Sequence, residues 1–431
     1  MAVVIEKSKF ISKIFFGVFW IVAITPFFGQ ELMLGVYEKL SSPMFALIDL
    51  AIIFLGLWTL KRKVDKFILL LFAAVAYISS CIFNDLSIIF FLNGLRLYIA
   101  YMMVVPIYNY FFSEESRRNA FVGKMDKALY IFLWFQFPTA VIQCVLYGAY
   151  DYVGGSLGWM MSGEMSTLVY LISFYFMHKK WDKDKSYIIN IKENWVLILL
   201  LLPSFLNETK ISFVYLLMYF FFLLPMDRKF IKRMLIFIPS MLVVILIAGY
   251  FYLSVTGASD DVMTEQYITM YLTGDDEALT YIEVAADKGV DEIGDDQGDL
   301  FRGIKFAAIP FVQMREPHAP YLGFGVGQFK GGSSIDKSEF AKEFDWLLKG
   351  TVMGIFAIII ELGYAGIILI ALFWWTVFRK QKDNVRNRQI TFYLILTILL
   401  LGVYNNAFIC VPFYLIFIYI SLISQHWNYT K

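Results

Sequence analysis

Long apolar runs separated by short polar segments make up most of the chain. Twelve such runs are roughly 15–28 residues long and mostly apolar, near the ~20 residues that a helix needs to cross ~30 Å of hydrocarbon. They lie at residues 10–29, 43–60, 67–85, 87–112, 127–149, 164–178, 194–208, 210–225, 233–254, 351–378, 389–407 and 409–424. The pattern predicts an all-α, polytopic integral membrane protein with about twelve transmembrane helices.

Four of these runs are short, namely 164–178, 194–208, 210–225 and 409–424. The second and third of them adjoin each other, so they form either a tight hairpin or segments that do not fully cross the membrane. The number of spans is therefore open at these positions.

One long hydrophilic segment, from about Val255 to Gly350, interrupts the apolar pattern. Its first half is acidic, with thirteen Asp and Glu against one Lys from Ser259 to Leu300, and its second half is basic and rich in glycine. The segment divides the chain into a bundle of nine expected helices (1–254), a large external loop (255–350) and a bundle of three expected helices (351–431). Such a loop favours chemistry at the membrane surface, because a simple pore has little need of one.

A helix is expected within this loop, from Asp299 to Pro310. Asp299 can cap its N-terminus, and Pro310 is expected to end it. Apolar side chains recur at helical spacing, which predicts a stripe that lies on the bundle or in the membrane interface. The stripe consists of Leu300, Ile304, Ala307, Ala308 and Phe311. Two shorter helices are expected at Thr264–Thr273 and Glu277–Ala286.

Basic side chains gather in alternate loops, and this bias sets the expected orientation. The basic loops carry Lys61, Arg62, Lys63 and Lys66; Arg117, Arg118, Lys124 and Lys127; Lys179, Lys180, Lys183, Lys185 and Lys192; Arg228, Lys229, Lys232 and Arg233; and Arg379, Lys380, Lys382, Arg386 and Arg388. The short loops between them hold Lys39 and Lys210. We therefore expect both termini to be cytoplasmic and the long loop to lie outside.

Composition agrees with a membrane protein. The chain is 59% hydrophobic and 19% aromatic, whereas soluble domains are about 45–50% apolar. The net charge is only +1, and we expect no nucleic-acid partner. The three cysteines, Cys81, Cys144 and Cys410, lie inside apolar runs and indicate packing residues, with neither a disulfide framework nor a metal-binding spacing.

Arg96 lies about nine residues into the run 87–112, roughly 14 Å below the expected outer surface at 1.5 Å per residue. A central arginine costs about 2.5–3.5 kcal/mol on insertion scales, and such charges usually face a cavity or a partner. We expect Arg96 either to help bind a substrate or to form a structural ion pair, with Glu361 as one candidate partner.

Three further cations could bind a lipid diphosphate. Lys210 follows Glu208 in a polar turn near the expected outer headgroups, where the alternative is an ordinary snorkelling lysine. Arg302 and Lys305 are three residues apart and share one helix face. Arginine binds phosphate bidentately and lysine acts as a point charge. The alternative for this pair is a solvated face or pairing with the acidic stretch.

The external loop offers three candidate general bases, namely His318, Glu343 and Asp345. A residue can act as the base only if it lies within reach of the proton to be removed, and its pKa matters after that. The alternative for each residue is a solvated loop side chain. The acidic run Asp287–Asp299 lacks the spacing of a calcium loop, so we expect neither a metal nor a cofactor.

Two other features of the outer side concern contacts rather than catalysis. The segment Gly323–Phe329 lacks the strand and βαβ unit of a dinucleotide site. Its glycines, Gly325 among them, still allow the backbone to approach a ligand or the membrane closely. Trp159 is an aromatic residue near the outer side that could stack on a sugar.

Taken together, these features resemble the O-antigen and exopolysaccharide polymerases, which share their fold with the O-antigen ligases. The topology matches over most of the chain, and the local patterns follow the family's order. These patterns are the glycine-containing outer loop Gly154–Gly163, the polar basic turn Glu208–Lys210, the basic helix at Arg302 with the Gly-x-Gly segment Gly323–Phe329, and the glycine-containing span at Glu361–Gly366. The resemblance implies a GT-C-like membrane fold.

The resemblance also implies a function. The protein would be a glycosyltransferase of the bacterial cytoplasmic (inner) membrane that transfers glycan from undecaprenyl diphosphate to the sugar end of another lipid-linked repeat unit, by inverting, metal-independent displacement. Lys210, Arg302, Arg96 and Lys305 would bind the diphosphate. Besides the undecaprenyl-diphosphate-linked oligosaccharide and the lipid bilayer, a chain-length regulator is an expected partner.

The chain departs from this family at Val352-Met353, where a His-Asn pair often stands. A ligase relies most on that histidine as the base for its acceptor, so its loss favours a polymerase and leaves the base unassigned. A ligase that transfers finished glycan to a lipid or protein stays an alternative. A polysaccharide transporter or flippase is the third, although the chain lacks the matching halves that transporters often have.

Overall fold

The computed structural model describes residues 2–149, 152–182, 184–207, 209, 211–224, 239, 302–328, 338–344, 347, 352–379, 385–406 and 410–426. Regular structure within these residues consists of helices alone. The expected span 233–254 and the expected helices Thr264–Thr273 and Glu277–Ala286 lie outside the described residues.

In the N-terminal part of the chain, up to Leu223, the helices follow one another with short connections. The N-terminal part contains α1 (Ala2–Leu32), α2 (Leu34–Thr59), α3 (Lys63–Tyr77), the π-helical turn η1 (Ile78–Phe83), α4 (Ile88–Phe112), α5 (Glu115–Tyr147), η2 (Gly155–Leu157), α6 (Ser162–Lys180), α7 (Tyr187–Glu193), α8 (Trp195–Leu199), η3 (Leu202–Phe205) and α9 (Ile211–Leu223). The C-terminal part contains α13 (Arg302–Gln313), α14 (Ala319–Leu322), α15 (Glu339–Glu343), α17 (Gly354–Phe378), α18 (Val385–Tyr404), α19 (Val411–Ile423) and η7 (Ser424–His426).

Six helices in the described part of the chain are long and apolar enough to cross a membrane. They are Glu6–Leu32, Leu34–Thr59, Lys63–Phe83, Ile88–Phe112, Glu115–Tyr147 and Gly354–Phe378. Shorter apolar helices occupy Ile211–Leu223, Arg388–Tyr404 and Val411–His426. The chain therefore has the helical, apolar architecture expected of a membrane protein, while the count of twelve spans stays a prediction.

The expected span 194–208 is not one straight helix. The α7 segment and the segment Trp195–Phe205 meet at a bend of 73°, and Asn194 lies at the break. Such a bent pair is a broken span or a re-entrant loop, and whether the run 194–208 crosses the membrane stays a prediction.

The α5 helix begins at Glu115, whereas the apolar run predicts a start at residue 127. The additional turns are charged, and their side chains support the helix locally. Arg117 Nε lies 2.9 Å from Glu114 Oε2, an i,i+3 pair at the helix start. The apolar pattern marks only the part of this helix that could lie in lipid, because polar helical turns carry no hydropathy signal.

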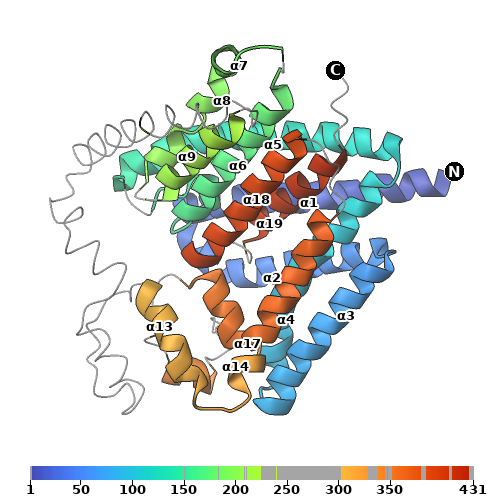
Figure 1. Cartoon of the computed structure of the whole chain (residues 1–431), viewed down its shortest axis with the longest axis vertical. Coiled ribbons are helices and arrows are strands. Elements are labelled where there is room, and N and C mark those ends of the chain that lie inside the picture. The colour runs from blue at the N-terminus through green and yellow to red at the C-terminus, as the bar shows by residue number, and fades with distance from the viewer. Residues whose placement is uncertain are drawn as a thin grey trace.

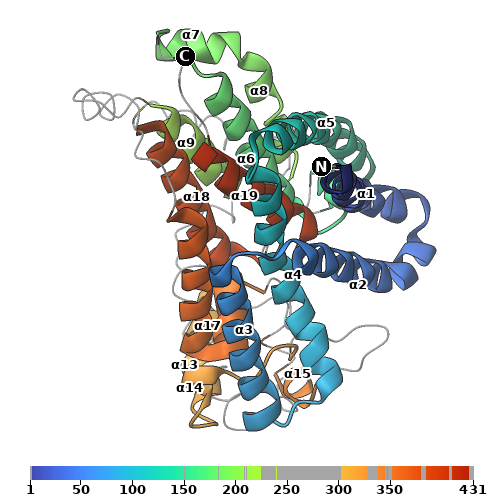
Figure 2. The same ribbon diagram turned by 90° about the vertical axis from the view of Figure 1, so that its right-hand side faces the viewer.

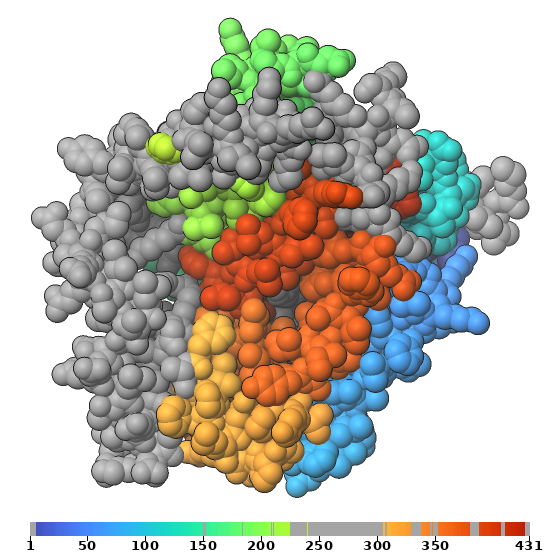
Figure 3. Space-filling view, in the orientation of Figure 1, coloured from blue at the N-terminus to red at the C-terminus, as the bar shows by residue number. Residues whose placement is uncertain are grey.

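Figures 1 and 2 show how the helices divide between the two ends of the molecule. The helices α3 and α17 and part of α4 lie side by side in the lower half, with α13 and α14 against the same end. The helices α5, α6, α9, α18 and α19 occupy the upper half, together with α7 and both marked chain ends. Figure 3 shows α13 and α14 on the surface beside α17.

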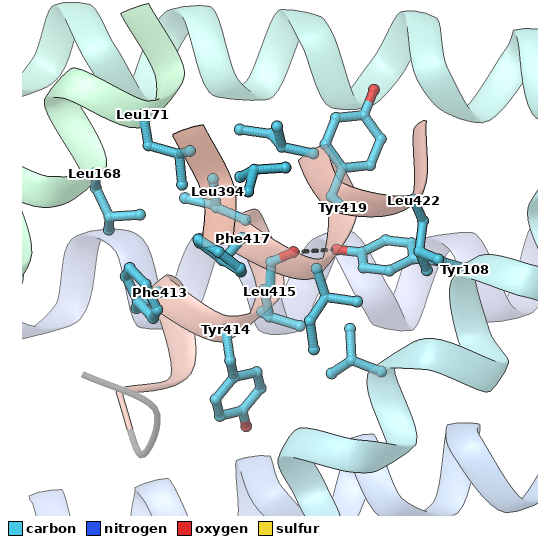
Figure 4. Close-up of a cluster of buried hydrophobic side chains, with 14 of the residues drawn as sticks. Tyr108, Leu168, Leu171, Leu394, Phe413, Tyr414, Leu415, Phe417, Tyr419 and Leu422 are labelled. Atoms are coloured by element: carbon cyan, nitrogen blue, oxygen red, sulfur yellow. Dashed lines mark hydrogen bonds between the residues drawn. The ribbon is translucent and has the colours of Figure 1, made fainter. Parts of the chain in front are cut away.

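The core is built around α19. Every residue of this helix is buried, as expected for a helix that is apolar on all sides. Figure 4 shows the hydroxyl of Tyr108 pointing at the backbone of α19, where it donates a hydrogen bond to the Leu415 carbonyl at 2.7 Å. The short run 409–424 is thus an interior helix, shielded by its neighbours from whatever surrounds the protein.

The helix expected at Asp299–Pro310 is present, but it ends later than expected. The α13 helix is described from Arg302 and continues through Pro310 to Gln313, so the prediction that Pro310 ends it is wrong. Packing offsets the backbone hydrogen bond that proline cannot donate, because Ala308, Ile309 and Val312 are buried in a cluster that includes residues of α17. With Lys305 they form an i, i+3, i+4, i+7 stripe, whereas Phe311, expected in the stripe, is 39% exposed.

Candidate functional site

Arg96 forms an ion pair inside the helix bundle. Its Nε lies 3.0 Å from Asp49 Oδ2, which joins α4 to α2. The Asp49 side chain is 2% exposed and that of Arg96 is 23% exposed. The hydroxyl of Tyr414 on α19 donates to Asp49 Oδ1 at 3.4 Å. The partner of Arg96 is thus Asp49, and the suggested pairing with Glu361 is wrong.

Asp49 is a residue that sequence reasoning missed. It lies inside the apolar run 43–60, so the rule that singled out Arg96, namely that a charge within a span needs a partner or a cavity, applies equally to it. Two buried opposite charges lower each other's burial penalty when their geometry is good. This pairing explains why an apolar bundle tolerates both residues.

One further polar group adjoins this ion pair. The Tyr414 hydroxyl hydrogen-bonds to Asp49, so the contact joins α2, α4 and α19. We name Asp49, Arg96 and Tyr414 the central polar cluster. Glu164 stands in the first turn of α6, directly after the glycine-containing segment Gly154–Gly163.

The glycine segment Gly323–Gly327 packs against other parts of the protein. Gly323, Gly325 and Gly327 all have positive φ angles, of 70°, 96° and 96°, which glycine adopts without strain. The Phe324 N–H donates to the Ile360 carbonyl at 2.8 Å, and the Gly325 N–H donates to the Glu361 carbonyl at 2.9 Å. These bonds form where α17 is broken, because Gly363 has non-helical angles (φ 60°, ψ −154°).

Glu361 fastens the same turn through its side chain. Its Oε1 accepts the Gly327 N–H at 2.9 Å, and its Oε2 accepts the Tyr98 hydroxyl at 2.6 Å. The carboxylate is 5% exposed. On the other side, Ser80 Oγ in the π-helical turn η1 accepts the Val326 N–H at 2.9 Å. The Gly323–Gly327 turn is thereby held between η1, α4 and α17.

A substitution at Glu361 tests this role. Glutamine at this position keeps one oxygen, and its NH₂ group cannot accept a hydrogen bond. In Glu361→Gln, either the Gly327 N–H or the Tyr98 hydroxyl therefore loses its acceptor. We expect the folded state to lose about 1–2 kcal/mol and residues 318–328 to exchange amide hydrogens faster. Thermal unfolding in detergent and hydrogen exchange would measure both. Glu114→Gln, at an exposed position, is the control, and equal protection in both variants would contradict the role.

The predicted general bases occupy other surroundings. His318 Nε2 lies 3.2 Å from Asn84 Oδ1, and its ring centroid lies 4.9 Å from that of Phe83. Glu343 forms an ion pair with Arg315 and is 52% exposed. Neither residue belongs to the central polar cluster, and Asp345 lies outside the described residues.

The predicted diphosphate ligands are described in part. Lys305 is fully buried on α13, so it does not lie on a solvated face. The side chain of Arg302, and the residues Lys210 and Glu208, lie outside what is described. Their convergence on one ligand stays a prediction.

Trp159 is anchored to α1: its indole Nε1–H donates to Glu31 Oε1 at 2.9 Å, and its backbone N–H donates to Gln30 Oε1 at 2.5 Å. Gly325 contacts η1, since a Cβ placed on it would lie 2.8 Å from Ser80 Cα. The expected approach of Gly325 to a ligand stays untested.

Among the described residues, no group of three or more His, Cys, Asp or Glu is placed to hold a metal ion. Comparisons with known proteins identify no relative: the chain matches no protein-family model, and no curated protein is similar enough to it to count as one.

Proposed function

We propose that the protein is a membrane glycosyltransferase that polymerises polysaccharide repeat units, transferring glycan from undecaprenyl diphosphate to the sugar end of another lipid-linked repeat unit. The observation that supports it best is Arg96, a cation inside an apolar bundle whose side chain is still 23% exposed beside Asp49. Ionisable residues within such a bundle usually line a substrate path or pair with one another.

The proposed reaction is a single displacement. The bond between the donor sugar's anomeric carbon and the diphosphate oxygen breaks, and that carbon bonds to a hydroxyl oxygen of the acceptor sugar, with inversion. Undecaprenyl diphosphate leaves with the bonding electron pair. Fixed cations stabilise the charge that develops on it, and we assign this role to Lys210, Arg302 and Arg96, with Lys305 close to Arg302 on α13.

The acceptor hydroxyl has to lose its proton to a general base. We keep Glu343 and His318 as candidates, which contact Arg315 and Asn84, and add Glu164 in the first turn of α6. A base must lie within reach of the proton that it removes, and this requirement precedes any tuning of its pKa. Asp345 stays a candidate as well.

The proposal includes an orientation in the bacterial inner membrane, with both termini cytoplasmic and the large loop outside. The arrangement in Figures 1 and 2 supports it, since both marked chain ends and α7 lie in the half of the molecule away from α13 and α14. The diphosphate of a lipid-linked substrate would then meet the side of the protein that carries α13.

The test compares a strain that lacks the protein with strains that carry variants. The deletion strain should accumulate single repeat units on lipid and make no polymer. Lys210→Ala and Arg302→Ala should reproduce this defect, because each removes a cation from the leaving group. The readouts are the polymer ladder on a gel and the lipid-linked glycans by mass spectrometry.

Lys124→Ala, which changes an exposed lysine of α5, is the matched control and should give a normal ladder. Normal ladders from both test variants would remove Lys210 and Arg302 from the mechanism. Accumulation of long lipid-linked polymer in the deletion strain would favour a ligase. Movement of the substrate across the membrane without new glycosidic bonds would favour a transporter.

A further inference from the structure

Glu31, near the end of α1, gathers donors from two other segments. Its Oε1 accepts the side-chain amide of Gln143 at 3.1 Å and the indole N–H of Trp159 at 2.9 Å. Its Oε2 accepts the Tyr147 hydroxyl at 2.6 Å. One carboxylate thereby ties the loop after α5 to the ends of both α1 and α5.

These bonds hold three aromatic rings against one another. The ring of Trp159 lies edge-on to those of Tyr147 and Tyr152, with centroids 5.5 and 5.8 Å away. The Tyr147 and Tyr152 centroids are 5.7 Å apart. We name Tyr147, Tyr152 and Trp159 the aromatic platform. It is open to the outside, because Tyr152 is 44% exposed.

The backbone beside the platform is unusual. Met160, which follows Trp159, has a φ of 62°, a conformation that residues other than glycine rarely adopt, and its side chain is 70% exposed. Left-handed backbone at a residue other than glycine persists where the surroundings impose it, and it clusters at binding sites and active sites. The loop that contains Trp159 thus includes a strained residue, Met160, whose backbone conformation costs free energy.

The platform differs from an ordinary belt of interfacial aromatics. In such a belt, tryptophan and tyrosine keep their rings in the lipid and point their polar atoms at the wet headgroup layer. Here the N–H of Trp159 and the hydroxyl of Tyr147 point inward at Glu31. The two rings are thus fixed to the protein interior by their polar atoms, and both residues are partly exposed.

We propose that the aromatic platform binds a sugar ring of the glycan substrate, an inference that rests on the proposed function. The apolar C–H face of a pyranose packs well on a fixed aromatic surface, while its hydroxyls stay in water. The position fits, because η2 in the same loop packs against α1, α5 and α6, and Glu164 opens α6. A glycan seated on the platform would lie beside the start of α6.

The test measures binding by the full chain in detergent, separately from polymerisation. The probes are oligosaccharides cut by mild acid from the cell's own surface polysaccharide, observed by saturation-transfer NMR. Wild type should bind them, and Trp159→Ala and Tyr152→Ala should each weaken binding about tenfold. Trp159→Phe keeps a ring but loses the bond to Glu31, so its affinity should fall between those of wild type and Trp159→Ala.

The control is Trp375→Ala, which removes a tryptophan of α17 that is 68% exposed and should leave binding unchanged. Unfolding temperatures of all variants separate lost affinity from lost fold. Absence of binding to wild type, or equal binding by wild type and a folded Trp159→Ala, would overturn the sugar site. Sugar binding that depends on Trp159 would support the sugar site whatever the deletion strain does. Polymer made by the deletion strain would contradict the polymerase proposal but not the sugar site.

Discussion

Arg96→Met is expected to abolish polymer and to destabilise the folded protein by about 3–5 kcal/mol, the usual cost of leaving a buried charge without its partner. Asp49 is 2% exposed and pairs with Arg96 at 3.0 Å, so it would stay ionised at a high cost or take up a proton. The polymer ladder measures the first effect, and thermal unfolding in detergent measures the second.

The single substitution mixes a structural with a functional loss, and a second variant separates them. Replacing both members, as Asp49→Leu with Arg96→Met, removes the two charges together. Apolar side chains of similar volume in place of a buried ion pair are often neutral or stabilising. The double variant should therefore regain most of the stability while still making no polymer.

Arg117→Met is the control, because Arg117 pairs with Glu114, whose side chain is 54% exposed; such surface pairs contribute about 0–1 kcal/mol. A double variant that folds and makes a normal ladder would show that Arg96 serves only the structure. The proposal would then lose its supporting cation within the bundle, and diphosphate binding would depend on Lys210 and Arg302 alone.

Gly94→Ala is expected to displace the Gly323–Gly327 turn and to cost about 3 kcal/mol, the upper end of the usual range for over-packing. A Cβ at Gly94 would lie 2.3 Å from the Gly327 nitrogen and 2.5 Å from its Cα. Both are backbone atoms, so no side-chain rotation relieves the clash. The Glu361–Gly327 hydrogen bond would break, and polymer yield should fall with it.

Gly17→Ala is a closely matched control for this change. Gly17 also lies in an apolar membrane-spanning candidate, and no atom lies within 4 Å of a Cβ placed on it. Alanine should there stabilise the helix by about 0.5–1 kcal/mol. Limited proteolysis and unfolding temperature would compare the two variants. Equal stability of both would mean that the turn is not packed against α4 as described.

The predicted helices that the structure confirms are those that depend on a local pattern in the sequence. The runs 10–29, 87–112 and 351–378 became α1, α4 and α17, because a stretch of apolar residues is helical and buried or lipid-facing wherever it packs. The helix in the long hydrophilic segment was predicted from its amphipathic spacing. Its end was misplaced, because burial of Ile309 and Val312 offsets the effect of Pro310.

The candidate site was predicted less well, because its members come from distant parts of the chain. Arg96 was singled out as an intramembrane charge, but its partner was sought at Glu361, which instead fastens the Gly323–Gly327 turn. Glu164 gave no signal, since an acid in the first turn of a helix is an ordinary helix-dipole partner. Glu31 was equally plain in sequence, although it carries the anchoring bonds of Trp159.

The sequence by itself determined that this is a helical, apolar protein with one long charged segment and a cation inside an apolar run. It could do so because hydropathy and helical period are properties of neighbouring residues. The tertiary structure decided that Asp49 pairs with Arg96, that α17 breaks to receive the glycine turn and that Glu31 fixes an aromatic platform. These contacts join residues that are far apart in sequence, and only the packing of helices against one another brings their side chains within hydrogen-bonding distance.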